Sequence, residues 1–232
     1  MRLYHFAGIL GVLLLCVGHY MGLFVAPAEA MMQNVGRILY AHVPTAWVSL
    51  VCFLIAFVCA IGALWTGGRG WDATTEASIE VGVVLTALLL FQGAVWGRPT
   101  WGVYWTWDPR LTTSAIMLIA FAVILLLRSI IEQPGRRLLV GSVATVVAFV
   151  DVPIVYYAAD WWNSLHQNHS SPETVSSTMV LPLRISAFGM LFLSLGFIGA
   201  RRRIAMHRLA KEDDPENLPE QPPELNLNGE SV

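Results

Sequence analysis

Charge is scarce in this chain. Asp, Glu, Lys and Arg make up 13% of its 232 residues, whereas soluble domains carry about 25%. The few charges are clustered, which leaves long windows without any of them. The sequence also lacks a P-loop and a Rossmann fingerprint. This composition excludes an ordinary soluble domain, and any ATP that the protein's work requires must be hydrolysed by a partner.

Cysteine is nearly absent as well. Cys16, Cys52 and Cys59 all fall inside apolar runs, and this odd number of membrane-embedded thiols argues against structural disulfides. Neither CxxC nor CxxCH occurs, so the chain is not itself a c-type cytochrome. We interpret the three cysteines as small apolar residues that pack within helices.

Hydrophobic residues, by contrast, make up 56% of the chain and lie in six long runs. A helix needs about 20 residues to cross ~30 Å of hydrocarbon, and the shorter runs reach this length only with polar residues at their ends. The predicted fold class is therefore an all-α integral membrane protein. Its six transmembrane helices are expected near residues 4–25, 41–65, 78–97, 111–130, 137–157 and 179–200.

Lys and Arg predict the orientation of these helices. With six spans both termini lie on one side, and that side receives most of the 14 basic residues. The positive-inside rule therefore predicts cytoplasmic termini. The loops at about 26–40, 96–110 and 158–178 then face outward. The first run is too long for the apolar core of a signal peptide, so we expect it to be retained.

The C-terminal end differs in composition from the rest of the chain. It is rich in acids and proline and poor in apolar residues. Such a segment cannot bury enough apolar surface to fold. We therefore divide the chain into a six-helix membrane domain at 1–205 and a disordered acidic cytoplasmic tail at 206–232.

The segment Trp96–Asp108 is the densest aromatic stretch of the chain. Besides Tyr104, it contains a large share of the chain's 9 tryptophans, namely Trp96, Trp101, Trp105 and Trp107. Clustered indoles form either a belt at the membrane interface or a platform for a flat ligand. A belt spreads its rings over many helix ends, whereas here they share one loop. The clustering therefore favours a platform, for which Asp108 is an organiser that accepts N–H hydrogen bonds.

Prolines and glycines mark expected interruptions of the helices. Pro44 suits the first turn of the second helix, where its missing N–H would be unpaired anyway. Pro99 and its neighbouring glycines are expected to interrupt the helix that leads into the aromatic loop. Asp151 lies deep in the fifth helix, where Pro153 would loosen the backbone. A buried acid there indicates either a functional group or the partner of an outward arginine.

Two outward histidines flank the aromatic loop. His42 lies at the start of the second helix, and His166 follows Trp161 and Trp162 in the third outward loop. Either histidine alone is more often an interfacial residue bonded to water or backbone. Their joint occurrence beside a slab of indoles suits haem, because neutral imidazole is the usual axial ligand of haem iron. No histidine on another predicted helix lies at the same membrane depth as His5 or His19, and we expect neither to bind iron.

Arginines on the outward side depart from the charge bias of the chain. A ligand with two propionates would account for them, and Arg98 and Arg110 are the best candidates because they bracket the aromatic loop. The alternative is that they pair with Asp108, Asp151 or Asp160.

The residues WGVYWTWD, from Trp101 to Asp108, resemble the WGxxWxWD signature (the WWD motif) of haem-handling proteins of cytochrome c maturation. The continuation PRLT at 109–112 is similar to the CcmC branch of that superfamily. The motifs AHVP at 41–44 and WWNSLHQ at 161–167 are also similar to those of CcmC. The resemblance covers roughly residues 1–205, and Tyr104 stands where some members carry another tryptophan.

This resemblance implies a function and a set of site residues. His42 and His166 would be the axial ligands of a transiently bound haem b, and Trp101, Trp105, Trp107 and Asp108 would belong to the platform. Haem would be bound at the periplasmic face of the bacterial inner membrane and delivered to the chaperone CcmE. The ABC transporter CcmAB and the small membrane protein CcmD would be the partners. The protein would be an assembly factor rather than an enzyme, and no role is implied for His169.

Two alternatives remain from the residues alone. A subunit that transports haem through the membrane should have discontinuous helices that meet near the middle of the bilayer. An electron-transfer b-type cytochrome should have paired histidines at matching depths.

Overall fold

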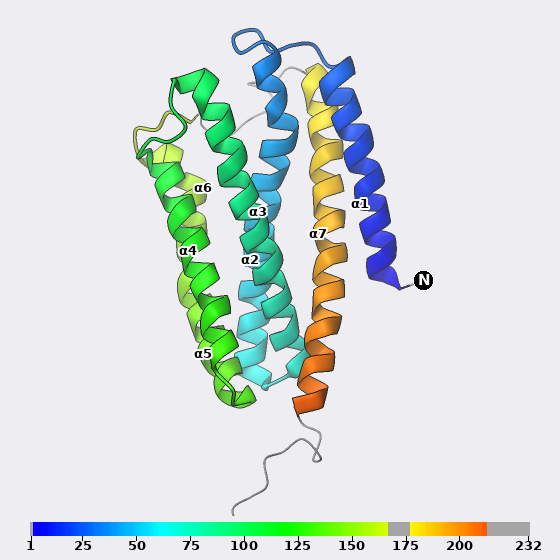
Figure 1. Cartoon of the computed structure of the whole chain (residues 1–232), viewed down its shortest axis with the longest axis vertical. Coiled ribbons are helices and arrows are strands. Elements are labelled where there is room, and N and C mark those ends of the chain that lie inside the picture. Colours follow the sequence, from blue (N-terminus) through cyan, green and yellow to red (C-terminus); the bar gives the residue numbers. More distant parts are fainter. Residues whose placement is uncertain (1, 167–176, 213–232) are drawn as a thin grey trace, which may run out of the picture.

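A computed structural model describes residues 2–166 and 177–212 of the chain, and this part is almost entirely helical (Figure 1). The described residues contain no strand, only one isolated bridge between Glu29 and Gln33. The long elements are α1 (Leu3–Tyr20), α2 (Leu39–Thr66), α3 (Arg69–Trp101), α4 (Pro109–Ile130), α5 (Pro134–Ala148), α6 (Asp151–Trp161) and α7 (Ser177–Glu212). The short elements are η1 (Met21–Val25), which prolongs α1, and η2 (Asn34–Ile38), which leads into α2.

Six helical segments are long and apolar enough to cross a membrane, which confirms the predicted fold class. Successive α5 and α6 together form one of these segments, Pro134–Trp161. The chain is thus a multi-pass membrane protein. Helix α7 continues to Glu212, so residues 206–212 are helical where a disordered tail was expected. Residues 213–232 lie outside the described part of the chain.

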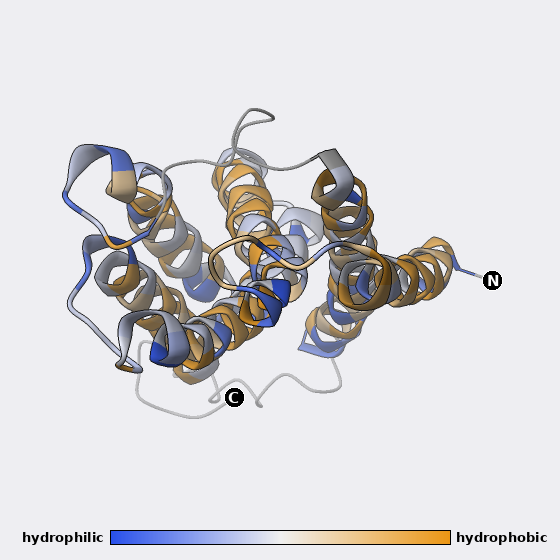
Figure 2. Cartoon of the chain, turned by 90° about the horizontal axis from the view of Figure 1, so that it is seen from above, coloured by the Kyte–Doolittle hydropathy of each residue, from blue (hydrophilic) through white to orange (hydrophobic). Residues whose placement is uncertain are grey.

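Helices α2 and α3 pack together and separate two flanking groups (Figure 1). On one side lie α4, α5 and α6, and on the other lies α7. Helix α1 lies at the edge of the bundle and packs mainly along α7 (Figure 2). A Cβ atom on Gly11 would lie 2.3 Å from the backbone nitrogen of Leu193, so only glycine permits this close approach of the two backbones.

The largest core cluster joins four of the helices. Phe53 of α2 stacks on Phe121 of α4 with ring centroids 3.8 Å apart, and Ile79 of α3 and Val155 of α6 are buried against them. The three cysteines are free thiols, as expected, although Cys16 is exposed while Cys52 and Cys59 are buried.

Two prolines lie inside helices, contrary to expectation. Helix α3 runs through Pro99 to Trp101 and is capped by Gly102, whose φ of 81° is left-handed. Pro99 has no N–H to donate to the carbonyl four residues earlier, and the hydroxyl of the next residue, Thr100, donates to the Trp96 carbonyl at 2.7 Å. Pro44 lies inside α2 rather than in its first turn, because the helix already begins at Leu39.

The fifth span is more strongly interrupted than expected. It divides at Phe149 and Val150, and Asp151 begins a new helix, α6. Proline displaces the carbonyl four residues earlier, and for Pro153 that carbonyl belongs to Phe149. The Phe149 carbonyl instead accepts the N–H of Val152 at 3.0 Å. Asp151 is therefore a helix-starting residue and not a residue within a continuous helix.

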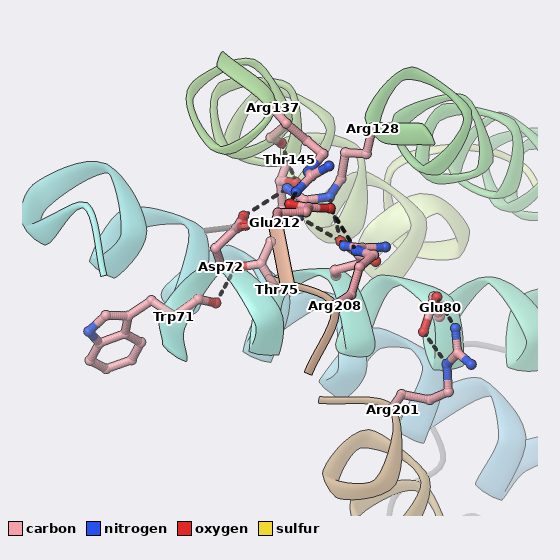
Figure 3. Close-up of polar contacts among 12 residues, drawn as sticks. Trp71, Asp72, Thr75, Glu80, Arg128, Arg137, Thr145, Arg201, Arg208 and Glu212 are labelled. Atoms are coloured by element: carbon pink, nitrogen blue, oxygen red, sulfur yellow. Dashed lines mark hydrogen bonds and ion pairs between the residues drawn. The ribbon is translucent and has the colours of Figure 1, made fainter. Parts of the chain in front are cut away.

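Ion pairs join the start of α3 to the ends of α4 and α7 (Figure 3), and those of Arg128 are buried. Asp72 and Glu76 of α3 flank Arg128 of α4, whose guanidinium lies 2.9 Å from Asp72 and 2.8 Å from Glu76. Arg208 of α7 reaches the same Glu76 oxygen at 2.8 Å. Arg201 donates two hydrogen bonds of 2.6 Å to Glu80, one turn of α3 further along. These pairs explain why α3 begins at Arg69 instead of near residue 78: its first acids are neutralised within the bundle.

Candidate functional site

The predicted site residues lie at one end of the bundle, which we call the Trp-loop end after the loop at 102–108. His42 lies near the start of α2, Trp96 and Trp101 lie in the last turns of α3, and His166 follows α6. The first turns of α4 contribute Arg110 there. Segments far apart in the sequence therefore meet at the Trp-loop end (Figure 1).

Asp108 is the polar centre of this end. It caps the N-terminus of α4, where its Oδ1 accepts the Arg110 N–H at 2.9 Å. Its Oδ2 accepts the Ser164 hydroxyl at 2.8 Å and the Leu165 N–H at 2.7 Å. Burial raises the pKa of Asp108, but the hydrogen bonds from Ser164 and Leu165 outweigh burial and hold that pKa below its usual value. Asp108 is thus an ionised acceptor, as its expected role as a loop organiser requires.

His166 is held by the same carboxylate. Its Nδ1 lies 3.2 Å from Asp108 Oδ1, and its backbone N–H donates to the Ser164 hydroxyl at 3.0 Å. The Trp101 indole meets the imidazole edge-on, with ring centroids 5.1 Å apart. Burial lowers the pKa of His166 and outweighs the Asp108 carboxylate, which raises it. The imidazole is therefore neutral near pH 7, the form that binds metals.

His42 has different surroundings. Its ring meets the Trp96 indole edge-on with centroids 5.4 Å apart, and its Nδ1 is buried without a hydrogen-bond partner in the described residues. A Cβ on Gly93 of α3 would lie 3.3 Å from His42 Cε1, so glycine leaves room for the ring. The Nε1 of Trp96 is likewise buried and unpartnered in this part of the structure.

The remaining indoles of the loop are more open to the surroundings. Trp105 and Trp107 meet edge-on at 5.8 Å, and 82% of Trp107 is exposed. Trp161 and Trp162 at the end of α6 are exposed too. The Trp-loop end thus has two indoles that contact the histidines and an outer set of indoles that are exposed.

The two candidate arginines are both engaged with their surroundings. Arg98 donates to the Gly102 carbonyl, and its guanidinium lies 5.7 Å from the centroid of the Tyr104 ring. Arg110 donates to the Tyr156 carbonyl of α6 at 3.0 Å.

Other histidines lie away from this cluster. His19 on α1 contacts the Leu15 carbonyl at 2.9 Å, and the ring of His5 packs against Tyr4. His169 lies outside the described residues. Among the residues that are described, no three His, Cys, Asp or Glu side chains converge on a common point. Haem iron takes two axial ligands from the protein and does not require three converging side chains.

Sequence reasoning missed the contribution of Ser164. A serine two residues before a histidine is a common local hydrogen-bonding pattern, because its hydroxyl can accept the N–H two positions later. That pattern was visible in the sequence, but the link from Ser164 to Asp108 spans distant segments and required the fold.

The fold and this end of the molecule define a class: a multi-pass helical membrane protein with two histidines beside a Trp-rich loop. The family model described as "Heme exporter protein C" matches residues 1–214. The chain is 31% identical to Heme exporter protein C of Bradyrhizobium diazoefficiens, over 85% of this chain and 77% of that protein. It is 33% identical to Heme exporter protein C of Escherichia coli K12, over 83% of this chain and 82% of the relative.

The Heme exporter protein C of Haemophilus influenzae is also 33% identical, over 88% of this chain and 83% of that protein. The chain belongs to the heme exporter protein C family. Membership in this family supports a role in haem handling for cytochrome c maturation.

Proposed function

We propose that this protein binds haem b at the Trp-loop end and delivers it to the haem chaperone CcmE for c-type cytochrome biogenesis. The observation that carries the proposal is that His42 and His166, from distant segments, each meet an indole from the last turns of α3. Two neutral imidazoles are the donor set of a six-coordinate haem iron. The buried Nε1 of Trp96, which has no hydrogen-bond partner in the described residues, suits a site that a ligand completes.

The indoles divide into two roles in this proposal. Trp96 and Trp101 hold the axial imidazoles by edge contacts, while Trp105 and Trp107 supply flat apolar surface to the porphyrin. Because Trp107 is largely exposed, one edge of the haem stays uncovered. An uncovered edge would let the chaperone reach the haem without first dismantling the site. Binding is then strong enough for capture and loose enough for release.

The propionates are the expected partners of Arg98 and Arg110. Both guanidinium groups are anchored at the Trp-loop end, Arg98 at the Gly102 carbonyl and Arg110 at the Tyr156 carbonyl. Guanidinium is the side-chain group best suited to paired hydrogen bonds with a carboxylate.

Orientation and partners follow from the same proposal. The Trp-loop end faces the periplasm and the termini face the cytoplasm of a bacterial inner membrane, as the positive-inside rule favours. The described chain contains no ATP-binding motif, so the ABC transporter CcmAB supplies any work from ATP. The small membrane protein CcmD completes the complex.

A second function, transport of haem through the membrane, is favoured by the break between α5 and α6. Transporters bind substrates where discontinuous helices meet. Asp151 follows this break, and its Oδ2 is buried without a hydrogen-bond partner among the described residues. If haem crosses here, Asp151→Asn should slow haem uptake into proteoliposomes while haem binding is kept. Equal haem uptake with the wild type and with Asp151→Asn would contradict this second function.

The main proposal is tested in cells that lack the chromosomal gene. His42→Ala, His166→Ala and His19→Ala are expressed beside the chaperone, and covalently haem-loaded chaperone is measured by haem staining. We expect loading to fall to background in the first two variants. His19→Ala is the matched control, because its ring is hydrogen-bonded to the Leu15 carbonyl of its own helix. Full loading with both His42→Ala and His166→Ala would contradict the proposal.

A further inference from the structure

The two imidazoles at the Trp-loop end have opposite hydrogen-bond surroundings. His166 has a carboxylate 3.2 Å from its Nδ1, while the Nδ1 of His42 is buried with no partner in the described residues. His42 otherwise meets the edge of Trp96 and lies close to Gly93, where a Cβ atom would be 3.3 Å from its Cε1. The Nδ1 of His166 therefore has a hydrogen-bond partner, which leaves the Nε2 on the other side of the ring for a ligand. The Nδ1 of His42 has no such partner in the described residues.

The donors around Asp108 determine which nitrogen of His166 carries the proton. Asp108 accepts N–H bonds from Arg110 and Leu165 and an O–H bond from Ser164, which is the pattern of an ionised acceptor. An ionised carboxylate cannot donate, so the Nδ1 of His166 carries the hydrogen of that contact. The Nε2 of His166 is then left with a free lone pair, ready to bind iron.

Asp108 also fixes the segment that carries His166. Its contacts with Ser164, Leu165 and His166 join the end of α6 to the N-terminus of α4. Ser164 completes the arrangement, since its hydroxyl donates to Asp108 and accepts the backbone N–H of His166 at 3.0 Å. The ring of His166 is thus held in both position and tautomer, whereas the Nδ1 of His42 has no hydrogen-bond partner in the described part of the chain.

We propose that Asp108 and Ser164 are positioning residues that make the two haem ligands unequal: His166 is the fixed ligand, and His42 is the ligand that an incoming nitrogen base replaces. This inference rests on the proposed function and goes beyond it. A carboxylate that accepts from the second nitrogen of a ligating histidine orients the ring and increases its basicity. The ring without an acceptor is the weaker donor, so release of haem begins on the His42 side.

The experiment titrates haemin into the purified full-length protein in detergent, with Kd read from the Soret band and spin state read from the visible spectrum. Asp108→Asn and Ser164→Ala are measured in three backgrounds: wild type, His42→Gly and His166→Gly. Asparagine is as good an N-cap as aspartate, so Asp108→Asn preserves the start of α4. Thr113→Val is the matched control, because the Thr113 hydroxyl bonds only to carbonyls of its own helix, at 2.8 Å and 3.3 Å.

We expect Asp108→Asn to raise the haemin Kd about 10- to 100-fold in the wild-type and His42→Gly backgrounds. In the His166→Gly background it should have no further effect, because the ligand through which it acts is gone. Ser164→Ala should act in the same direction with a smaller change, and Thr113→Val should leave Kd unaltered. Added imidazole should restore a low-spin spectrum at lower concentration in His42→Gly than in His166→Gly.

Two results would overturn the inference while the proposed function stands. One is an equal effect of Asp108→Asn in the two glycine backgrounds, which is the mark of a general structural role. The other is an unchanged Kd with both Asp108→Asn and Ser164→Ala. If Asp108→Asn does not fold, the haemin Kd of Ser164→Ala in the two glycine backgrounds tests the inference instead. Failure of the proposed function looks different, since haemin would then bind wild type and both glycine variants alike.

Discussion

Replacing Arg128 with leucine is expected to lower the free energy of unfolding by about 3–5 kcal/mol. Arg128 and Asp72 form an ion pair of 2.9 Å in which each side chain is only 3% exposed. Leucine would leave the Asp72 carboxylate buried without the cation that contacts it. Glu76 would still have Arg208 at 2.8 Å, so the cost arises mainly at Asp72.

The measurement is unfolding in mixed micelles with increasing SDS, followed by tryptophan fluorescence. Arg201→Leu is the matched control, because Arg201 also pairs with an acid of α3 but its side chain is 48% exposed. An exposed pair contributes about 1 kcal/mol or less. The double variant Asp72→Leu with Arg128→Leu removes both charges and should recover most of the loss. Equal destabilisation by Arg128→Leu and Arg201→Leu would refute this reasoning.

Three further predictions concern the other parts of the molecule. Gly11→Ala should destabilise the α1–α7 contact by about 1–3 kcal/mol in the same unfolding assay, since its Cβ would meet the Leu193 backbone at 2.3 Å. Gly8→Ala, with nothing within 4 Å, should not. Trp107→Ala should leave the unfolding midpoint unchanged and weaken haemin binding by about 0.5–1.5 kcal/mol in titrations, because this ring is largely exposed and is proposed to contact the porphyrin. Because the pKa of His166 is lower in the folded protein than in the unfolded chain, the unfolded chain binds a proton at a higher pH. The free energy of unfolding should therefore fall as the pH drops below about 6.5. His166→Ala should reduce this dependence of stability on pH. The lowered pKa of Asp108 adds a second loss below about pH 4, which Asp108→Asn should remove.

The spans of the membrane domain could be predicted because hydrophobic runs report directly on passage through lipid. Their ends were harder to place. Asp72 and Glu76 resemble loop residues in the sequence, yet in the bundle they are neutralised by arginines from α4 and α7. A charge predicts the end of a span only when it has no partner inside, and partners on distant helices are not visible in a linear sequence.

The candidate site was only partly accessible from the sequence. The residue types of His42, His166 and the indoles pointed to a flat, metal-containing ligand, and the fold brings these residues to one end. Their unequal support was not predictable, because Asp108 is far from Ser164 in sequence and contacts it only through tertiary structure. Asp151 shows the reverse: Pro153 marked a local disturbance, and the helix indeed divides at Phe149 and Val150.

The central claim is that His42 and His166 bind haem iron together. Electron paramagnetic resonance of the purified protein with ferric haem tests it most directly. We predict the low-spin signal of two imidazole ligands in the wild type and a high-spin, five-coordinate signal in His42→Ala and in His166→Ala. A low-spin signal that is unchanged in both variants would contradict the claim.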